Sequence, residues 1–196
     1  MGVIVEGRIR TRDQILAHAV ELASIQGLEG LSIGRLAAQL AMSKSGVFRH
    51  FGSKQELQLA TVERASALFR REVMEPATAA PPGLERLHAL IGGYLSYLER
   101  DVLPGGCFFS AAAAEFGGRP GPVRDAIATF SREWATELES QARIARDHGE
   151  LPTDEDPAQL AFELGACAAR ANTAYQLHGD RSGFDRARAA LHERLD

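Results

Sequence analysis

The chain has 196 residues and a formal charge of −4 at pH 7, a length that suits one or two domains with a sizeable buried core. Its apolar runs are too short to cross a membrane and its charged first residues do not fit a secretory signal, so we expect a cytoplasmic protein with no membrane partner. Two cysteines without paired spacing (Cys107 and Cys167) and six histidines without metal-ligand spacing predict no disulfide framework, no metal site and no cofactor.

Residues 11–26 form the first predicted helix. Thr11 and Gln14 have the spacing of a capping box, and apolar residues follow at the intervals of one helix face. A link that contains glycine, residues 27–32, then leads to the next helix.

The segment 31–57 predicts two short helices separated by a tight turn and followed by a further helix start. Ser32 can cap the first of these helices and Ser43 the second, and Ser53 opens the next as part of a capping box. Helix, short turn and helix is the layout that places a second helix in the major groove of DNA. The pattern therefore predicts a DNA-binding head at residues 1–54.

Charge supports this interpretation of residues 1–54. They carry seven basic and four acidic side chains, so the head is positive although the whole chain is negative. Both lysines of the chain, Lys44 and Lys54, lie here, and a lysine near a helix N-terminus adds a cation to amides that suit phosphate. The plain alternative is that these polar side chains form an ordinary solvated face.

The run SKSGVFRHFGSKQEL, residues 43–57, resembles the signature of the TetR family of transcriptional repressors for the third helix and the start of the fourth. The resemblance extends back through residues 11–32. It departs from the family at two positions, because Phe48 stands where the family usually has tyrosine and Gly46 replaces a larger residue at a position facing the bases.

The resemblance implies that the head binds double-stranded operator DNA. Residues 44–46 are expected to reach base edges and the others to hold phosphates and orient the helix, with Arg49 in either role. The predicted DNA contacts are Ser32, Lys44, Ser45, Gly46, Phe48, Arg49, His50 and Lys54.

Apolar residues continue at helical spacing to the C-terminus, and no strand pattern, repeat or low-complexity tract interrupts them. Prolines and glycines separate the segments. We therefore predict an all-α fold of about nine helices, with the head at residues 1–54 and a ligand-binding and dimerisation domain at residues 55–196. The predicted helices of the second part are 53–73, 84–98, 107–116, 122–138, 156–175 and 182–195.

The segment 107–116 is apolar all round except at Ser110 and Glu115, and a helix of that kind is usually buried on every side. The resemblance implies an effector pocket among the helices that surround it, and a mostly apolar pocket suits a small apolar ligand. Plain core packing is the alternative for each single aromatic residue. The predicted pocket residues are Phe69, Tyr94, Leu98, Cys107, Phe109, Ala112, Glu115, Phe116, Phe130 and Trp134.

Two of these residues could have chemistry of their own. Glu115 either accepts a hydrogen bond from the effector or pairs with Arg119 or Arg124, and the structural pair is favoured because a buried carboxylate needs a partner. Cys107 is either a redox sensor or an inert buried thiol, and nothing nearby in sequence activates it.

The last two predicted helices are expected to form a homodimer. The first is rich in alanine and glycine, which let another helix approach closely, and both carry larger apolar residues. Pairing them with their symmetry mates gives a four-helix, two-fold interface, although the small residues could equally pack only against their own chain. The predicted interface residues are Leu160, Leu164, Gly165, Ala168, Tyr175, Phe184, Leu191 and Leu195.

The sequence thus predicts a repressor that a small, largely apolar effector releases from a near-palindromic operator. One alternative is a helix-turn-helix regulator without such an effector, acting as an activator or under the control of a protein partner. The other alternative is an enzyme that uses the helical cavity. The sequence shows no catalytic triad or acid–base pair, so we expect no enzymatic activity.

Overall fold

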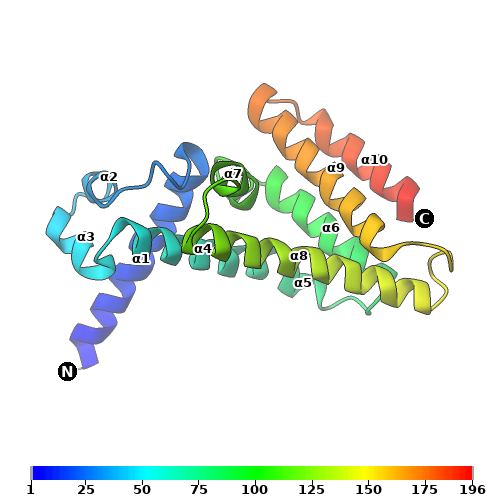
Figure 1. Cartoon of the computed structure of the whole chain (residues 1–196), viewed down its shortest axis with the longest axis horizontal. Coiled ribbons are helices and arrows are strands. Elements are labelled where there is room, and N and C mark those ends of the chain that lie inside the picture. Colours follow the sequence, from blue (N-terminus) through cyan, green and yellow to red (C-terminus); the bar gives the residue numbers. More distant parts are fainter. Residues whose placement is uncertain (1, 196) are drawn as a thin grey trace. The chain divides into compact units, whose positions relative to one another are not determined.

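The computed structural model describes residues 2–195, with side chains from Thr11 onward, and its described residues are helical with no strand. Because α4, η1 and α5 follow one another without a break, the elements amount to nine helices, and the predicted all-α fold is confirmed. They are α1 (Gly2–Gln26), α2 (Ile33–Gln39), α3 (Lys44–Phe51), α4 (Lys54–Phe69), the π-helical turn η1 (Arg70–Met74), α5 (Glu75–Ala77), α6 (Leu84–Glu99), α7 (Phe108–Phe116), α8 (Pro122–Asp147), α9 (Pro157–His178) and α10 (Ser182–Leu195) (Figure 1).

Local side-chain caps begin the short helices as the sequence predicts. The hydroxyl of Ser32 accepts from the backbone N–H of Arg35 (3.3 Å) at α2, and Ser53 accepts from Glu56 (3.1 Å) at α4. The predicted start of the first helix at Thr11 is wrong. The helix begins at Gly2, and the capping-box spacing at Thr11 falls inside it, where residues 2–10 contain no proline that would end a helix.

The chain divides into two compact units, each built from two stretches of sequence. Unit 1 comprises residues 1–67 and 103–128, and unit 2 comprises residues 68–102 and 129–196. The predicted division into a DNA-binding domain at residues 1–54 and an effector-binding and dimerisation domain at residues 55–196 stays a prediction. None of the described helices is both long and apolar enough to span a membrane.

Unit 1 holds the head together with α7. In it α1 packs against α2 and α7, and α2 packs against α3. The inward faces of these helices supply the core side chains, among them Ile15, Leu36, Val47 and Phe116, so the apolar spacing of the sequence becomes the core of this unit.

Unit 2 contains three helices packed together, with α9 lying along α10 and both contacting α6 (Figure 1). Phe184 of α10 is completely buried at their centre. At the end of α10, Arg194 forms ion pairs of 2.7 Å with both Glu155 and Glu163, and the hydrogen bonds to these carboxylates raise the pKa of Arg194. The C-terminal helix is therefore fixed both by its apolar face and by charged pairs at its end.

Candidate functional site

The turn between α2 and α3 sets the orientation of α3. Ala41 adopts a left-handed backbone conformation (φ 51°), and the N–H of Met42 donates to the carbonyl of Ala37 (2.9 Å). The Ser43 hydroxyl then caps α3 by accepting from Gly46 N–H at 3.0 Å. An added Cβ at Gly46 would lie only 3.0 Å from that hydroxyl oxygen, so the glycine makes room for the cap.

This geometry separates the two faces of α3. Val47 and Phe51 are buried in unit 1. The opposite face is exposed and presents Lys44, Ser45, Phe48 and Arg49. Ser32 and His50, the predicted phosphate contacts at either side, are half-buried. A capped helix with a polar, exposed face that begins with a lysine is suited to enter a groove lined by phosphates.

Lys54 is already engaged within the head. Its ammonium donates to the backbone carbonyl of Glu29 (2.6 Å) and to the Glu29 carboxylate (2.8 Å). The hydrogen bond from Lys54 is the largest influence that lowers the pKa of Glu29. A lysine ammonium has three N–H donors, so these two bonds leave one for the predicted phosphate contact and fix the direction of the side chain.

Among the residues whose side chains the structure describes, Glu115 pairs with no arginine, contrary to the favoured prediction. Its carboxylate oxygen Oε2 accepts from the backbone N–H groups of Leu28 (2.7 Å) and Glu29 (3.2 Å) in the link between α1 and α2. Arg119 instead lies 3.6 Å from the Glu29 carboxylate, and Arg124 pairs with its neighbour Asp125 at 3.1 Å. Two adjacent amides satisfy a carboxylate as well as a guanidinium does, but they have no sequence signature.

The ten predicted pocket residues fall in both units. Unit 2 contains Phe69, Tyr94, Leu98, Phe130 and Trp134, and unit 1 contains Cys107, Phe109, Ala112, Glu115 and Phe116.

In unit 2 the aromatic residues form one cluster around Phe69. Its ring centroid lies 5.1 Å from Trp134, 5.4 Å from Tyr94 and 5.4 Å from Phe130, distances typical of favourable edge-to-face and tilted pairs. Trp134 is half-exposed, whereas the other three rings are buried. The cluster is therefore part of the core of unit 2, and Trp134 is its one partly exposed member.

A charged pair lies beside this aromatic cluster. The guanidinium of Arg70, at the start of η1, is 5.4 Å from the ring centroid of Phe130 and bonds the Glu133 carboxylate with Nε at 2.6 Å. That hydrogen bond lowers the pKa of Glu133 and raises the pKa of Arg70. Sequence reasoning missed both residues, because η1 brings them together across a gap of 63 positions.

In unit 1 the remaining pocket candidates are packed. Phe109, Ala112 and Phe116 of α7 are buried, and so is Cys107, which precedes the helix. The ring centroid of Phe109 lies 5.2 Å from that of Phe108. α7 thus uses these side chains for the core of its own unit.

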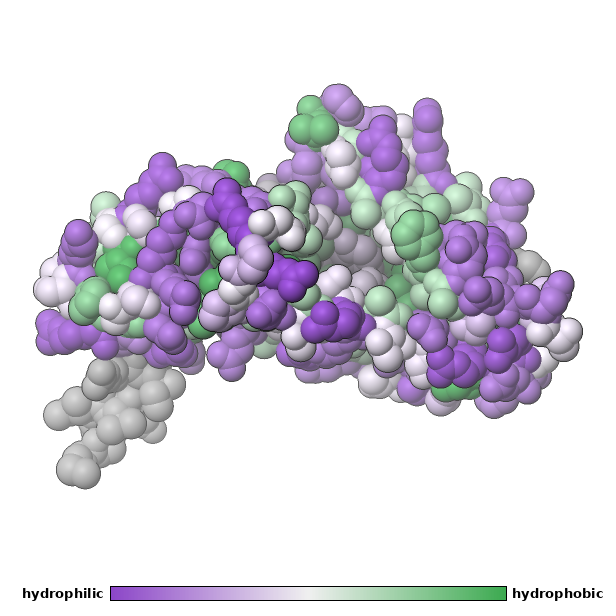
Figure 2. Space-filling model, in the orientation of Figure 1, coloured by the Kyte–Doolittle hydropathy of each residue, from purple (hydrophilic) through white to green (hydrophobic). Residues whose placement is uncertain are grey.

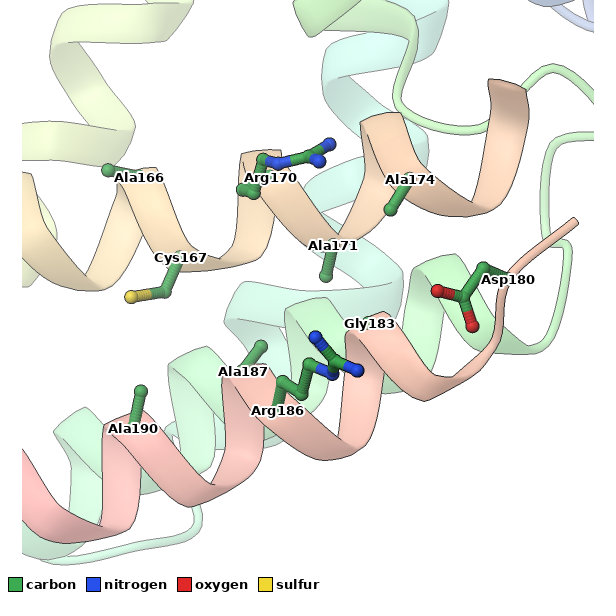
Figure 3. Close-up of a pocket in the computed structure, with 10 residues that line it drawn as sticks. All are labelled: Ala166, Cys167, Arg170, Ala171, Ala174, Asp180, Gly183, Arg186, Ala187 and Ala190. Atoms are coloured by element: carbon green, nitrogen blue, oxygen red, sulfur yellow. The ribbon is translucent and has the colours of Figure 1, made fainter. Parts of the chain in front are cut away.

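A groove lies between α9 and α10 in unit 2, with a volume of about 480 Å³. Figure 3 shows short side chains that point from each helix toward the other, including Cys167 and Ala171 from α9 and Ala187 from α10. Arg170 and Arg186 lie at its border (Figure 3). Small side chains leave this surface open enough for another helix to approach.

Most of the predicted interface residues cannot provide much contact area, because their own chain covers them. Leu160, Leu164, Ala168 and Phe184 are at most 1 % exposed, and Leu191 and Leu195 are also buried. Gly165 and Tyr175 are half-buried, and the hydroxyl of Tyr175 donates to Asp101 (2.8 Å). Helical spacing identifies the apolar faces of α9 and α10. In the structure these faces pack against α6 and against each other.

The outer side of α9 carries large exposed apolar residues that are not among the predicted interface residues. Phe162 and Leu177 are each 71 % exposed, and they are separated by about four helical turns, which places them on one side of the helix. Ala166 and Thr173 are exposed between them, so these four residues form an outer stripe. Figure 2 shows a hydrophobic patch at the C-terminal end of α9 on a mostly hydrophilic surface.

Comparison with known families decides the identity. Residues 83–191 match the family model described as "Tetracyclin repressor-like, C-terminal domain", and residues 15–61 match "Bacterial regulatory proteins, tetR family". The chain belongs to the TetR family of transcriptional regulators. In this TetR-family chain the second model covers most of α1, the helix-turn-helix of α2 and α3, and the start of α4.

The sequence identity between this TetR-family chain and individual relatives is low. It is 31 % identical over 91 residues to the HTH-type transcriptional regulator TcmR of Streptomyces glaucescens, a match that covers 46 % of this chain and 38 % of TcmR. A TetR regulator from Chloroflexus aurantiacus has the same fold, with a TM-score of 0.88 at 23 % identity over 96 % of this chain and 95 % of that one. The structure of AibR in complex with isovaleryl coenzyme A and operator DNA gives a TM-score of 0.78 at 22 % identity, over 94 % and 98 % of the two chains.

Proposed function

We propose that this TetR-family regulator is a repressor that binds a near-palindromic operator as a homodimer and leaves it when a small, largely apolar effector binds. The observation that carries DNA recognition is the exposed face of α3, which begins at Lys44 behind the Ser43 cap while Val47 and Phe51 anchor the opposite face. In a two-fold dimer each α3 can enter the major groove of one half-site.

The DNA contact is tested with a duplex selected from randomised sequences or genomic fragments. Lys44→Ala will lower the affinity for this duplex about tenfold and relax the sequence preference, as expected for a side chain at a base edge. Lys54→Ala will weaken binding without relaxing the sequence preference, because its ammonium bonds Glu29 and has one donor left for a phosphate rather than a base edge. Fluorescence anisotropy over a salt series measures both effects.

The control for this test is Gln55→Ala, which changes an exposed residue at the start of α4 and leaves both lysines in place. Equal affinities for wild type, Lys44→Ala and the control would contradict the placement of α3 in the groove. A wild type that selects no duplex would contradict DNA recognition altogether.

The aromatic cluster of unit 2 supports an apolar effector. It offers buried rings with one half-exposed aromatic edge at Trp134 beside the Arg70–Glu133 pair. An effector can release operator only if it binds the DNA-free form more tightly than the bound form. The AibR structure contains isovaleryl coenzyme A, whose acyl group is a small branched aliphatic chain, together with operator DNA, so ligands with a short apolar group belong in the search.

Trp134 is the only tryptophan of the chain, so its fluorescence reports directly on this cluster. A library of apolar acids, aromatic compounds and acyl thioesters will contain a compound that changes the Trp134 emission and weakens operator binding over the same concentration range. Trp134→Phe removes the optical signal and serves as the control for inner-filter effects. Ligands that change emission without any effect on operator affinity would instead favour a regulator without a small effector.

The homodimer is proposed to use the outer stripe of α9 (Phe162, Ala166, Thr173 and Leu177) and the groove between α9 and α10. Large exposed apolar side chains favour burial against a partner, and the small residues of the groove allow the partner helix to come close. A two-fold axis through this surface pairs the same stripe from both protomers.

A further inference from the structure

We propose that Glu115 of α7 is a positioning residue for DNA binding, because its carboxylate fixes the link between α1 and α2 (residues 27–31) and with it the helices that present the DNA-reading face. The inference rests on the proposed DNA-binding function. The apolar composition of α7 does not by itself indicate a role in DNA binding.

The Glu115 carboxylate binds the N–H groups of the link. Oε2 of Glu115 accepts from two consecutive backbone amides, those of Leu28 (2.7 Å) and Glu29 (3.2 Å). Bonds from amides to an ionised carboxylate are stronger than those to a neutral acceptor. The link is thereby tied to a helix that lies 86 to 87 positions away in sequence.

Gly27 makes space for this carboxylate. Its φ is +82°, a conformation that favours glycine, and a Cβ at this position would lie 1.9 Å from Oε1 of Glu115. Any larger residue would have to displace the carboxylate from the amides. Gly27 and Glu115 therefore act as one unit, although each has a different role.

The start of α4 holds the same two link residues from their carbonyl side. Gln58 donates its side-chain amide to the carbonyl of Leu28 (3.0 Å), and Lys54 donates to the carbonyl of Glu29 (2.6 Å). The link thus has its N–H groups bound by α7 and its carbonyls bound by α4. The link leads into α2, and α4 begins three residues after α3 ends. The bonds to the link therefore hold the two helices that flank the recognition helix α3.

A double-mutant cycle on the full chain tests the proposal with the selected operator duplex. Glu115→Ala will lower operator affinity about tenfold, because the link is no longer held and the binding-competent arrangement of the head becomes a minor fraction of the population. Gly27→Ala will also weaken binding, because its methyl group pushes the carboxylate away. The double variant will lose less affinity than the product of the two single losses, since the second change finds the contact already broken.

Two further variants separate positioning from general loss of stability. Glu115→Gln keeps an acceptor oxygen at the same position and will recover most of the affinity that Glu115→Ala loses. Glu63→Ala removes an exposed carboxylate from α4 in the same unit and will bind operator like wild type. All measurements are made well below the unfolding temperature of the least stable variant.

A spectroscopic readout follows the contact itself. In the ¹⁵N-labelled chain the amide protons of Leu28 and Glu29 will move upfield in Glu115→Ala and exchange faster with solvent, while Glu63→Ala leaves them unchanged. Wild-type operator affinity in Glu115→Ala, or strict additivity with Gly27→Ala, would overturn the positioning role alone. Absence of DNA binding by the wild type would overturn the proposed function itself, and with it this role.

Discussion

A chain that carries both Phe162→Glu and Leu177→Glu will be monomeric at micromolar concentration and will bind operator about a hundredfold more weakly than wild type. Both side chains are 71 % exposed on the outer side of α9, so the charges do not disturb the core of a single protomer. Two-fold symmetry places the glutamates of one protomer against the same surface of the other, and like charges at an apolar interface oppose association. A monomer then loses the second half-site contact.

Light scattering gives the mass, and anisotropy with the selected duplex gives the affinity. Ile25→Glu is the matched control, since Ile25 is a large apolar residue of α1 that is 61 % exposed and lies outside the proposed interface. A double variant that remains dimeric, or a wild type that is monomeric, would show that α9 does not form the interface. A monomeric variant with undiminished affinity would separate dimerisation from operator binding.

Gly105→Ala will lower the free energy of unfolding by about 3 kcal/mol, as a severe case of overpacking. An added Cβ at Gly105 would lie 1.9 Å from the backbone oxygen of Ser24 and 2.7 Å from the nitrogen of Ile25. Backbone atoms cannot move aside by changing rotamer, so α1 and the segment before α7 have to separate. The hydrogen bond from the Gly105 N–H to the Ser24 hydroxyl (3.1 Å) would be lost as well.

The effect is measured as the shift of the urea unfolding midpoint at constant slope. Gly118→Ala is the control, because a Cβ at Gly118 meets nothing within 4 Å and the two glycines belong to the same unit. A similar midpoint for both variants would show that the backbone at Gly105 relaxes without cost.

The features that were predictable from sequence are those whose partners lie close along the chain. The hydroxyls of Ser32, Ser43 and Ser53 each accept from an N–H three residues ahead, so the capping pattern itself indicates where the helices begin. The buried side of α3 was predictable for the same reason, since Val47 and Phe51 are one helical turn apart.

The features that were not predictable depend on which surfaces meet. Leu160 and Leu164 have the spacing of an apolar helix face, but spacing alone does not say whether a neighbouring helix or a second protomer covers it. Glu115 was expected beside an arginine, because a sequence shows charged side chains and does not show which backbone amides a distant link leaves open. Phe162 lies outside the apolar periodicity of α9, so helical spacing does not indicate that such a large apolar residue is exposed there.

The two-stretch construction of unit 1 has a consequence for recombination between relatives. Residues 103–128 belong to the same compact unit as residues 1–67, and Glu115 bonds the link of the head across that gap in sequence. A chimaera that exchanges only the first stretch combines the link of another protein with the α7 of this chain. The Glu115 carboxylate then faces backbone amides that are not in the positions of Leu28 and Glu29. Grafting a new operator specificity onto this chain therefore requires both stretches, or a donor head whose link already accommodates a carboxylate at this point.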